Sequence, residues 1–226
     1  DLFLSVFYFA GVAGPISTAL IIMASAASIA GAFNITSLLG HDPASSQRLL
    51  ILGTVLLPVT ILPVFYLSPE LSDPTLIVET AVRLTVVIGV SAGLAYFLRA
   101  MVFRHMQPGQ LKAVDGISVI VMAVVVIGLM SALGPALVSK PWLVLTTMAV
   151  VFVANYGLQV TSYFVLRFWV SLKDRVGISV VAGNRNMALF LAALPASVTE
   201  PLLLFIACYQ LPMYLTPLLL RSEEHT

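Results

Sequence analysis

The chain has 226 residues, of which 60% are hydrophobic and only 9% are charged. Soluble domains contain about 45–50% apolar and about 25% charged residues, so this composition excludes an ordinary soluble protein. The net charge of +1 and the single cysteine, Cys208, argue against nucleic-acid binding, an intrachain disulfide and a zinc cluster. Apolar stretches of about 20 residues recur, the length of a membrane-spanning helix, and predict an all-α polytopic membrane protein in a lipid bilayer.

The two ends of the chain differ from the rest. The sequence begins at Asp1 in a short apolar stretch, Leu2 to Ala13, which is a partial span, so we expect an N-terminal part to precede it. The last six residues, RSEEHT (221–226), fit codon for codon the translation of a sequencing-adapter string. We expect this tail to be foreign to the natural protein rather than a native polar end.

Gly, Pro and charged residues divide the chain into seven spans, or eight with the partial one. The seven run over residues 16–39, 49–67, 75–98, 116–133, 142–169, 176–194 and 202–220. The connections GPALVSKP and PASVTEP are predicted to be loops.

Loop charges predict how the spans are oriented. One set of alternate loops is basic, and the other carries Glu70, Asp73 and Glu200 with only Lys140. Because cytoplasmic loops carry excess Lys and Arg, we expect the basic loops and the C-terminus to be cytoplasmic. The basic residues of these loops are Arg48, Arg99, Arg104, Lys112, Lys173 and Arg175.

A polar group interrupts the middle of span 176–194. Gly183-Asn184-Arg185-Asn186 lies between apolar residues on both sides. An arginine at mid-bilayer costs about 2.5–3.5 kcal/mol, whereas Gly and Asn tolerate irregular backbone. We predict a broken helix whose two ends face a ligand. The alternative is a continuous helix in which Arg185 pairs with an acid elsewhere.

Small and hydroxyl residues crowd a second stretch, SAASIAGAFNITS (25–37), which contains Ser28 and Asn34. This pattern fits either a second broken helix in the other half of the chain or a tightly packed helix face without a ligand.

Two further sets of polar residues follow helical spacing. Asn155, Gln159 and Ser162 share one helix face, which fits either an aqueous path or interhelical hydrogen bonds. Glu79 and Arg83 stand at i and i+4 inside a span, which favours an ion pair and leaves a proton relay or substrate contact as the alternative. No nucleophile–base set, carboxylate pair or phosphate-binding loop is visible, so we expect no enzyme, no cofactor and no metal site.

Two segments resemble the bile acid:sodium symporter family. GNRNMALFLAALPASVTEPLLLFIACYQLPMYLTP (183–217) is similar to its ninth and tenth helices. TSLLGHDPASSQRLLILGTVLLPVTILP (36–63), with Asp42 followed by Pro58, is similar to the junction of its fourth and fifth helices. The resemblance covers about residues 16–220 and implies ten helices in two inverted repeats.

The resemblance implies a core domain and a panel domain. Broken fourth and ninth helices would cross near the midplane, where substrate and sodium bind. On this chain, residues 1–220 would form a partial transporter domain, with core spans over 2–67 and 142–220 and panel spans over 75–133.

The chain departs from the family where sodium would bind. Against the family pattern Glu-x-Gly-x-Gln-Asn, this sequence keeps Gly183 and Asn186 but has Val181 and Arg185 in place of the Glu and the Gln. Neither replacement offers an oxygen ligand, so sodium coupling is not expected. Arg185 would instead bridge the broken helices through their C-terminal carbonyls, or contact an anionic substrate directly.

The fourth and fifth helices differ from the family in part. The family's Ser-Asn pair falls near Ala32-Phe33, one residue before Asn34. A Ser of the fifth helix is kept as Ser46, and a Thr is replaced by Leu50.

We therefore expect a secondary transporter of a small organic anion, working by alternating access in a bacterial inner membrane, with proton coupling or none. The alternatives are a sodium-coupled symporter with unusual ligands and a membrane sensor without transport activity. The residues expected around the central site are Gly183, Asn184, Arg185, Asn186, Ser28, Asn34, Ser46, Asn155 and Gln159.

Overall fold

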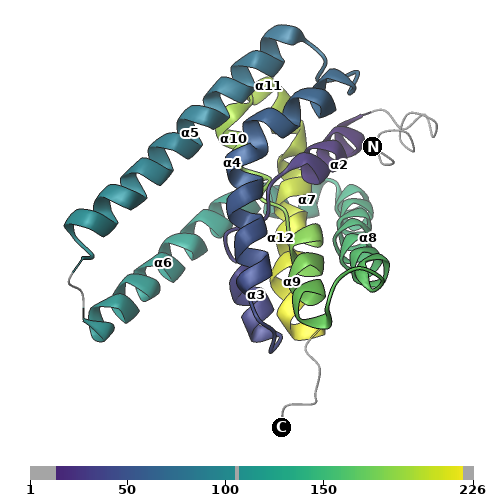
Figure 1. The fold of residues 1–226 in the computed structure, drawn as a ribbon. Coiled ribbons are helices and arrows are strands. Elements are labelled where there is room, and N and C mark those ends of the chain that lie inside the picture. The colour runs from purple at the N-terminus through teal and green to yellow at the C-terminus, as the bar shows by residue number, and fades with distance from the viewer. Residues whose placement is uncertain (1–13, 105–106, 221–226) are drawn as a thin grey trace.

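The computed structural model describes residues 14–104 and 107–220, and over these residues the chain is helical (Figure 1). This part of the chain contains no β-strand, only one isolated antiparallel bridge. The partial span 2–13 and the adapter-like tail 221–226 lie outside the described residues. The elements are α2 (Pro15–Ser25), α3 (Ala32–Leu38), α4 (Ala44–Tyr66), α5 (Pro74–Met101), α6 (Pro108–Leu129), η1 (Met130–Ala132), α7 (Leu133–Ser139), α8 (Pro141–Leu166), α9 (Leu172–Gly183), α10 (Ala188–Ala193), α11 (Ala196–Thr199), η2 (Glu200–Leu202) and α12 (Leu203–Leu219).

The chain is an all-α polytopic membrane protein. Within the described residues, five helical segments are long and apolar enough to cross a membrane. They are α4, α5, the α6–α7 run, α8 and the α11–α12 run. The two remaining predicted spans, 16–39 and 176–194, are each divided into two shorter helices, α2 with α3 and α9 with α10.

Two predicted loops are wrong, because both are mostly helical. GPALVSKP lies largely in α7, and only Lys140 separates α7 from α8. PASVTEP forms α11 and most of η2. Pro141 and Pro201 occupy the first turns of the helices that follow, where a fixed φ and a missing N–H cost nothing. Proline therefore marks helix starts in this chain as well as helix ends.

The start of α5 shows a complete N-cap. The Asp73 carboxylate accepts hydrogen bonds from the Thr75 amide at 2.8 Å and from the Thr75 hydroxyl. These bonds lower the pKa of Asp73, since they favour its charged form. The cap fixes the point at which the chain turns from α4 into α5.

The main packed core lies among α2, α4, the first half of α5, α8, α10 and α12, and a smaller cluster joins α3 to α9. Phe65 of α4 and Phe190 of α10 are both buried, with ring centroids 5.9 Å apart. Because an aromatic pair buries a large apolar area, this contact holds the broken α9–α10 segment against the continuous α4.

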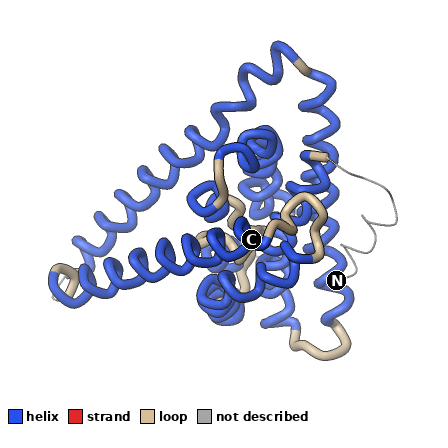
Figure 2. The backbone as a smooth tube through the Cα atoms, turned by 90° about the horizontal axis from the view of Figure 1, so that it is seen from above, coloured by secondary structure: helices blue, strands red, loops and turns tan. Residues whose placement is uncertain are grey.

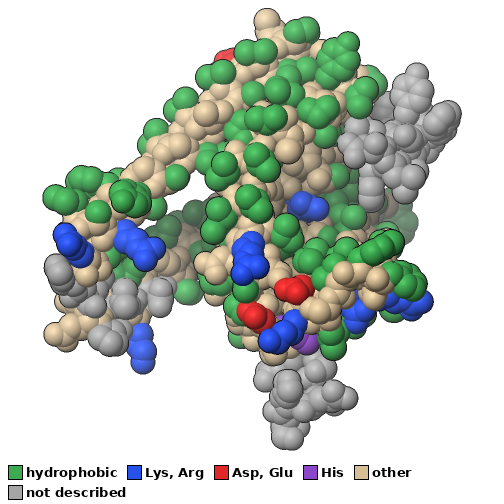
Figure 3. All heavy atoms as spheres, viewed as in Figure 1, with side chains coloured by type: hydrophobic (Ala, Val, Ile, Leu, Met, Phe, Trp, Pro, Cys, Tyr) green, Lys and Arg blue, Asp and Glu red, His purple; other side chains and the backbone are tan. Residues whose placement is uncertain are grey.

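α5 and α6 project from this core as a V-shaped arm (Figures 1 and 2). α5 packs against α4 and α10 near its own start, and its far end meets α6 away from the core. Only 6% of the spanning window of α5 is buried within the chain. Figure 3 shows apolar side chains over much of this arm and basic side chains gathered in the lower half of the view. The exposed apolar surface of the arm suits contact with lipid.

Candidate functional site

The two helix breaks meet in the middle of the molecule. Ser28, between α2 and α3, pairs with Arg185, between α9 and α10, as an isolated antiparallel bridge. The Ile29 amide donates to the Asn184 carbonyl at 3.0 Å, and the Asn186 amide donates to the Ala27 carbonyl at 2.7 Å. Backbone groups freed by each break are thus satisfied by the other break, as a membrane interior requires. The break predicted at 183–186 is confirmed, and of the two interpretations of 25–37 the structure shows the broken helix. We call this meeting point the crossing.

The crossing lies beside the middle of two spanning helices. A Cβ added to Gly53, halfway along α4, would be 3.9 Å from the Cβ of Ala27. Gly183 lies against Asn155, halfway along α8. In Figure 1, α3 and α9 extend below the crossing, and α2 and α10 extend above it. The crossing is therefore midway between the two ends of the spanning helices.

The guanidinium group of Arg185 joins the ends of two helices. Its Nε donates to the carbonyl of Ala182, in the last turn of α9, at 2.9 Å. Its Nη1 donates to the carbonyl of Ala26, the C-cap of α2, at 3.1 Å. A bridge between C-terminal carbonyls was one of the two roles expected for Arg185.

Arg185 has no acidic partner among the described residues. The ion pair found in this part of the chain joins Arg83 to Glu79. The alternative of a continuous helix with an Arg185–acid pair is therefore wrong. The side chain is half-buried, and its Nη2 makes no hydrogen bond to any described residue. One guanidinium nitrogen thus remains available to a ligand.

Tyr209 of α12 forms hydrogen bonds to the backbone of the α9–α10 break. Its hydroxyl donates to the Gly183 carbonyl and accepts a hydrogen bond from the Arg185 amide at 3.1 Å. Tyr209 is fully buried, so neither bond competes with water. Tyr209 was not among the residues predicted from sequence, although Tyr209-Gln210 interrupts an apolar run as the other polar sites do.

Asn155 of α8 holds the same break through its amide. Its Nδ2 donates to the Gly183 carbonyl at 2.7 Å and to Oδ1 of Asn184 at 3.4 Å. Nδ2 of Asn184 donates in turn to the Val180 carbonyl at 2.8 Å, which satisfies one carbonyl at the end of α9.

Gln159 extends this network toward α12. Its Nε2 donates to Oδ1 of Asn155 at 2.6 Å and to the Thr216 hydroxyl at 3.3 Å. Its Oε1 has no partner among the described residues. Asn155 and Gln159 are 0% and 2% exposed, so the structure favours interhelical hydrogen bonding over an aqueous path on this helix face.

Gly183 is required by close packing. A Cβ there would lie 2.4 Å from the Asn155 carbonyl oxygen and 2.4 Å from Cγ of Gln159. Among the described residues, positive φ occurs at Gly14 and Gly40 and not at either break. Backbone freedom, the reason expected for this glycine, is therefore not what the structure uses.

Of the remaining predicted residues, Ser28 belongs to the crossing and two others do not. The Ser28 hydroxyl donates to the Asn184 carbonyl at 3.4 Å. Asn34 is exposed in the first turn of α3, and Ser46 is buried at the start of α4, donating to the Pro43 carbonyl at 2.8 Å. Because α3 already begins at Ala32, the break ends before the position that the family pattern suggested.

Glu79 and Arg83 form the predicted i, i+4 ion pair on α5. The side chains are 56% and 47% exposed on the projecting arm and make no contact with the crossing. The structure therefore separates this pair from the candidate site.

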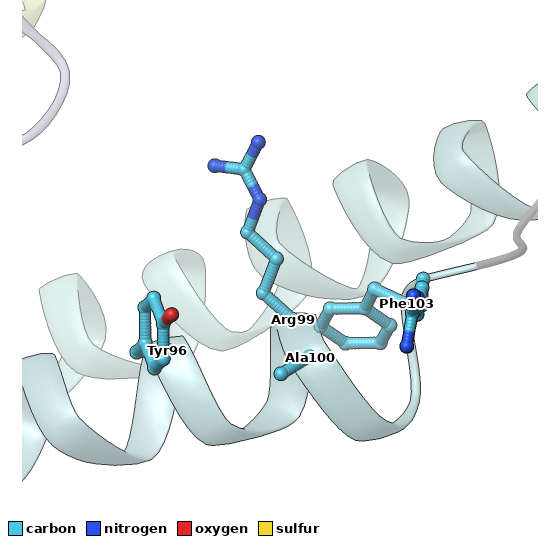
Figure 4. A pocket seen from close by; sticks show the side chains of 5 residues that line it. Tyr96, Arg99, Ala100 and Phe103 are labelled. Carbon is cyan, nitrogen blue, oxygen red and sulfur yellow. The ribbon is translucent and has the colours of Figure 1, made fainter.

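A second location, at the far end of α5, is less suited to a site. Tyr96, Arg99, Ala100, Phe103 and Arg104 line an open hollow there (Figure 4). All five residues come from one helix end, and none is buried. The crossing, with buried polar groups from four segments, is the candidate functional site.

No protein-family model and no curated protein sequence matches this chain. The functional interpretation therefore depends on the geometry of the crossing.

Proposed function

We propose that this chain is a secondary transporter that carries a small organic anion across the membrane by alternating access, with the crossing as its binding site. The observation that supports the proposal is the Arg185 guanidinium, which is half-buried midway along the bundle. Among the described residues it has no carboxylate partner, and its Nη2 makes no hydrogen bond. A cation in such a position is costly, and charged groups that persist there usually contact a substrate or a partner.

The groups beside Arg185 suit a carboxylate or sulfonate. Guanidinium binds planar oxyanions with directional hydrogen bonds, and Nη2 is free to take part. The Asn186 side chain is half-buried next to it and makes no hydrogen bond within the described residues, so its amide supplies a further donor. The surrounding polar side chains on α8, Asn155 and Gln159, position the break rather than face the ligand.

The arrangement of helices offers a route for alternating access. α5 contacts α10, one half of a broken helix, while most of the α5–α6 arm is free of the core. Movement of the arm against the core would open the crossing to one side and then to the other. We also propose that the protein lies in a bacterial inner membrane. The loop charges favour an orientation in which the basic loops are cytoplasmic.

The proposal is tested by reconstituting the protein in liposomes and screening carboxylates and sulfonates against their uncharged amide analogues. Anions should raise the melting temperature and enter the liposomes, while the amides should do neither. Arg185→Gln should lose anion stabilisation, whereas Arg83→Gln on the arm should keep it. Preferential binding of neutral or cationic compounds, or unchanged anion binding by Arg185→Gln, would overturn the proposal.

The same experiment separates the two alternatives. A sodium-coupled symporter should accumulate the anion only under an inward sodium gradient. A sensor should be stabilised by the anion but show no flux.

A further inference from the structure

We infer that Arg185 is the permanent cation of the crossing: its guanidinium takes the place that a bound metal cation would need, so the crossing assembles without sodium. The inference deepens the proposed function, because it concerns what the anion carrier is coupled to, but its evidence and its test do not depend on transport.

Two helix C-termini point at this guanidinium. α2 ends at Ser25 and α9 at Gly183, and Arg185 bonds to the carbonyls of Ala26 and Ala182 at these ends. The C-terminus of a helix carries about half an elementary negative charge, and its last carbonyls lack intrahelical partners. A positive group is therefore stabilised here by both helices at once. In transporters with broken helices, these are also the groups that coordinate a coupling cation.

Three other backbone carbonyls of the crossing already accept hydrogen bonds. The Ala27 carbonyl accepts from the Asn186 amide, and the Asn184 carbonyl accepts from the Ile29 amide. The Gly183 carbonyl accepts from both Asn155 and Tyr209. A sodium ion at these carbonyls would compete with the donors that they already accept.

A metal cation at the crossing would also need a negatively charged ligand to offset its own charge. No carboxylate within the described residues pairs with Arg185, and Val181, in the last turns of α9, offers only a hydrocarbon side chain. The residues present therefore do not fit the sodium that the family resemblance implies. Added sodium would meet like-charge repulsion from Arg185 at the same carbonyls.

The first test is a thermal-stability titration of the purified protein in detergent, without substrate. Raising sodium at constant ionic strength against choline should leave the melting temperature unchanged. A sodium-specific rise that potassium and choline do not produce would overturn the inference. This measurement needs only the unmodified chain.

The second test removes the tethered cation and supplies a free one. Arg185→Ala should lower the melting temperature, and low-millimolar guanidinium should restore at least half of the loss. Urea, which has a similar planar shape without the charge, should restore none. Arg175→Ala is the matched control. Arg175 donates to the Tyr163 hydroxyl at 3.1 Å and does not belong to the crossing, so guanidinium should not rescue this variant.

Equal effects of guanidinium and urea on Arg185→Ala would overturn the inference. If Arg185→Ala does not fold, Arg185→Lys keeps the charge without the forked donors, and it should fold with the sodium indifference of the unmodified protein. A sodium requirement in Arg185→Lys would contradict the inference. Failure of anion transport would leave all of these stability results unaffected, so the two proposals are judged separately.

Discussion

Gly183 lies so close to Asn155 that a Cβ on the glycine would come within 2.4 Å of the Asn155 carbonyl oxygen. The contact joins the end of α9 to the middle of α8 and brings the Gly183 carbonyl within reach of the Asn155 amide at 2.7 Å. The close approach of these two helices is what allows the polar network of the crossing to form.

Gly183→Ala should therefore destabilise the protein strongly. The clash involves backbone, which cannot move aside cheaply, and overpacking of this kind costs about 1–3 kcal/mol or more. We expect a clear drop in the melting temperature in detergent and loss of anion stabilisation.

Gly177→Ala on the same helix is the control for that change. There the nearest atom to an added Cβ, the Ser46 backbone nitrogen, is 3.4 Å away, which is ordinary contact. Alanine is also favoured over glycine in a helix by about 1 kcal/mol. An equal drop in melting temperature in the two variants would show that the close contact at Gly183 does not limit stability.

Tyr209→Phe should lower the free energy of unfolding by about 1–3 kcal/mol, since it leaves the half-buried Arg185 amide without its acceptor. The ring and its packing stay in place, so the loss reports the hydroxyl alone. Thermal melting in detergent measures it. Tyr214→Phe on the same helix should change little, because Tyr214 is 44% exposed. A Tyr209→Phe variant as stable as the parent would mean that another donor and acceptor satisfy this break.

Periodicity and polarity predicted the spans and one break from sequence, and they gave the second break as one of two alternatives. Arg185, flanked by amides in an apolar run, marked one break, because the cost of a mid-membrane arginine leaves few other solutions. The bridge from Arg185 to two helix ends was also foreseen as one of two options. These features depend on single residues and on the cost of burying them.

Features that depend on tertiary contact could not be predicted in the same way. Asn34 and Ser46 were both expected at the crossing. The start of α3 at Ala32 leaves Asn34 exposed in its first turn, and Ser46 bonds to Pro43 at the start of α4. The close approach at Gly183 depends on where α8 lies, which no local pattern specifies. Tyr209 lies in α12, where no polar site was predicted. Its partners are backbone groups of Gly183 and Arg185, far away in sequence.

Asn155 and Asn184 should be energetically coupled. Asn155→Ala removes the donor to Asn184, and Asn184→Ala removes both that acceptor and the bond to the Val180 carbonyl. Residues in one hydrogen-bond network typically show coupling of about 0.5–3 kcal/mol in a double-mutant cycle. The cycle is measured by unfolding of the two single variants and the double variant.

A cycle between Asn155→Ala and Thr85→Ala is the reference for that coupling. Thr85 bonds only to its own helix on the arm, at the Ala81 carbonyl, so its effect should add to that of Asn155. Additive losses for Asn155 and Asn184 would contradict a shared network.

Glu79 and Arg83 should act as a self-neutralising pair on α5 rather than as part of the transport route. Glu79→Gln leaves an unpaired arginine on a lipid-facing helix, and Arg83→Gln leaves an unpaired carboxylate. The cost is below the roughly 2.5–3.5 kcal/mol of a mid-membrane charge, because Glu79 is only in the second turn of α5. Each single variant should therefore insert and melt less well than the parent, while the double variant, with no charge left to neutralise, should recover. Anion uptake by the double variant should match the parent with and without a pH gradient. Loss of gradient-driven uptake in a stable double variant would instead assign the pair a role in proton transfer.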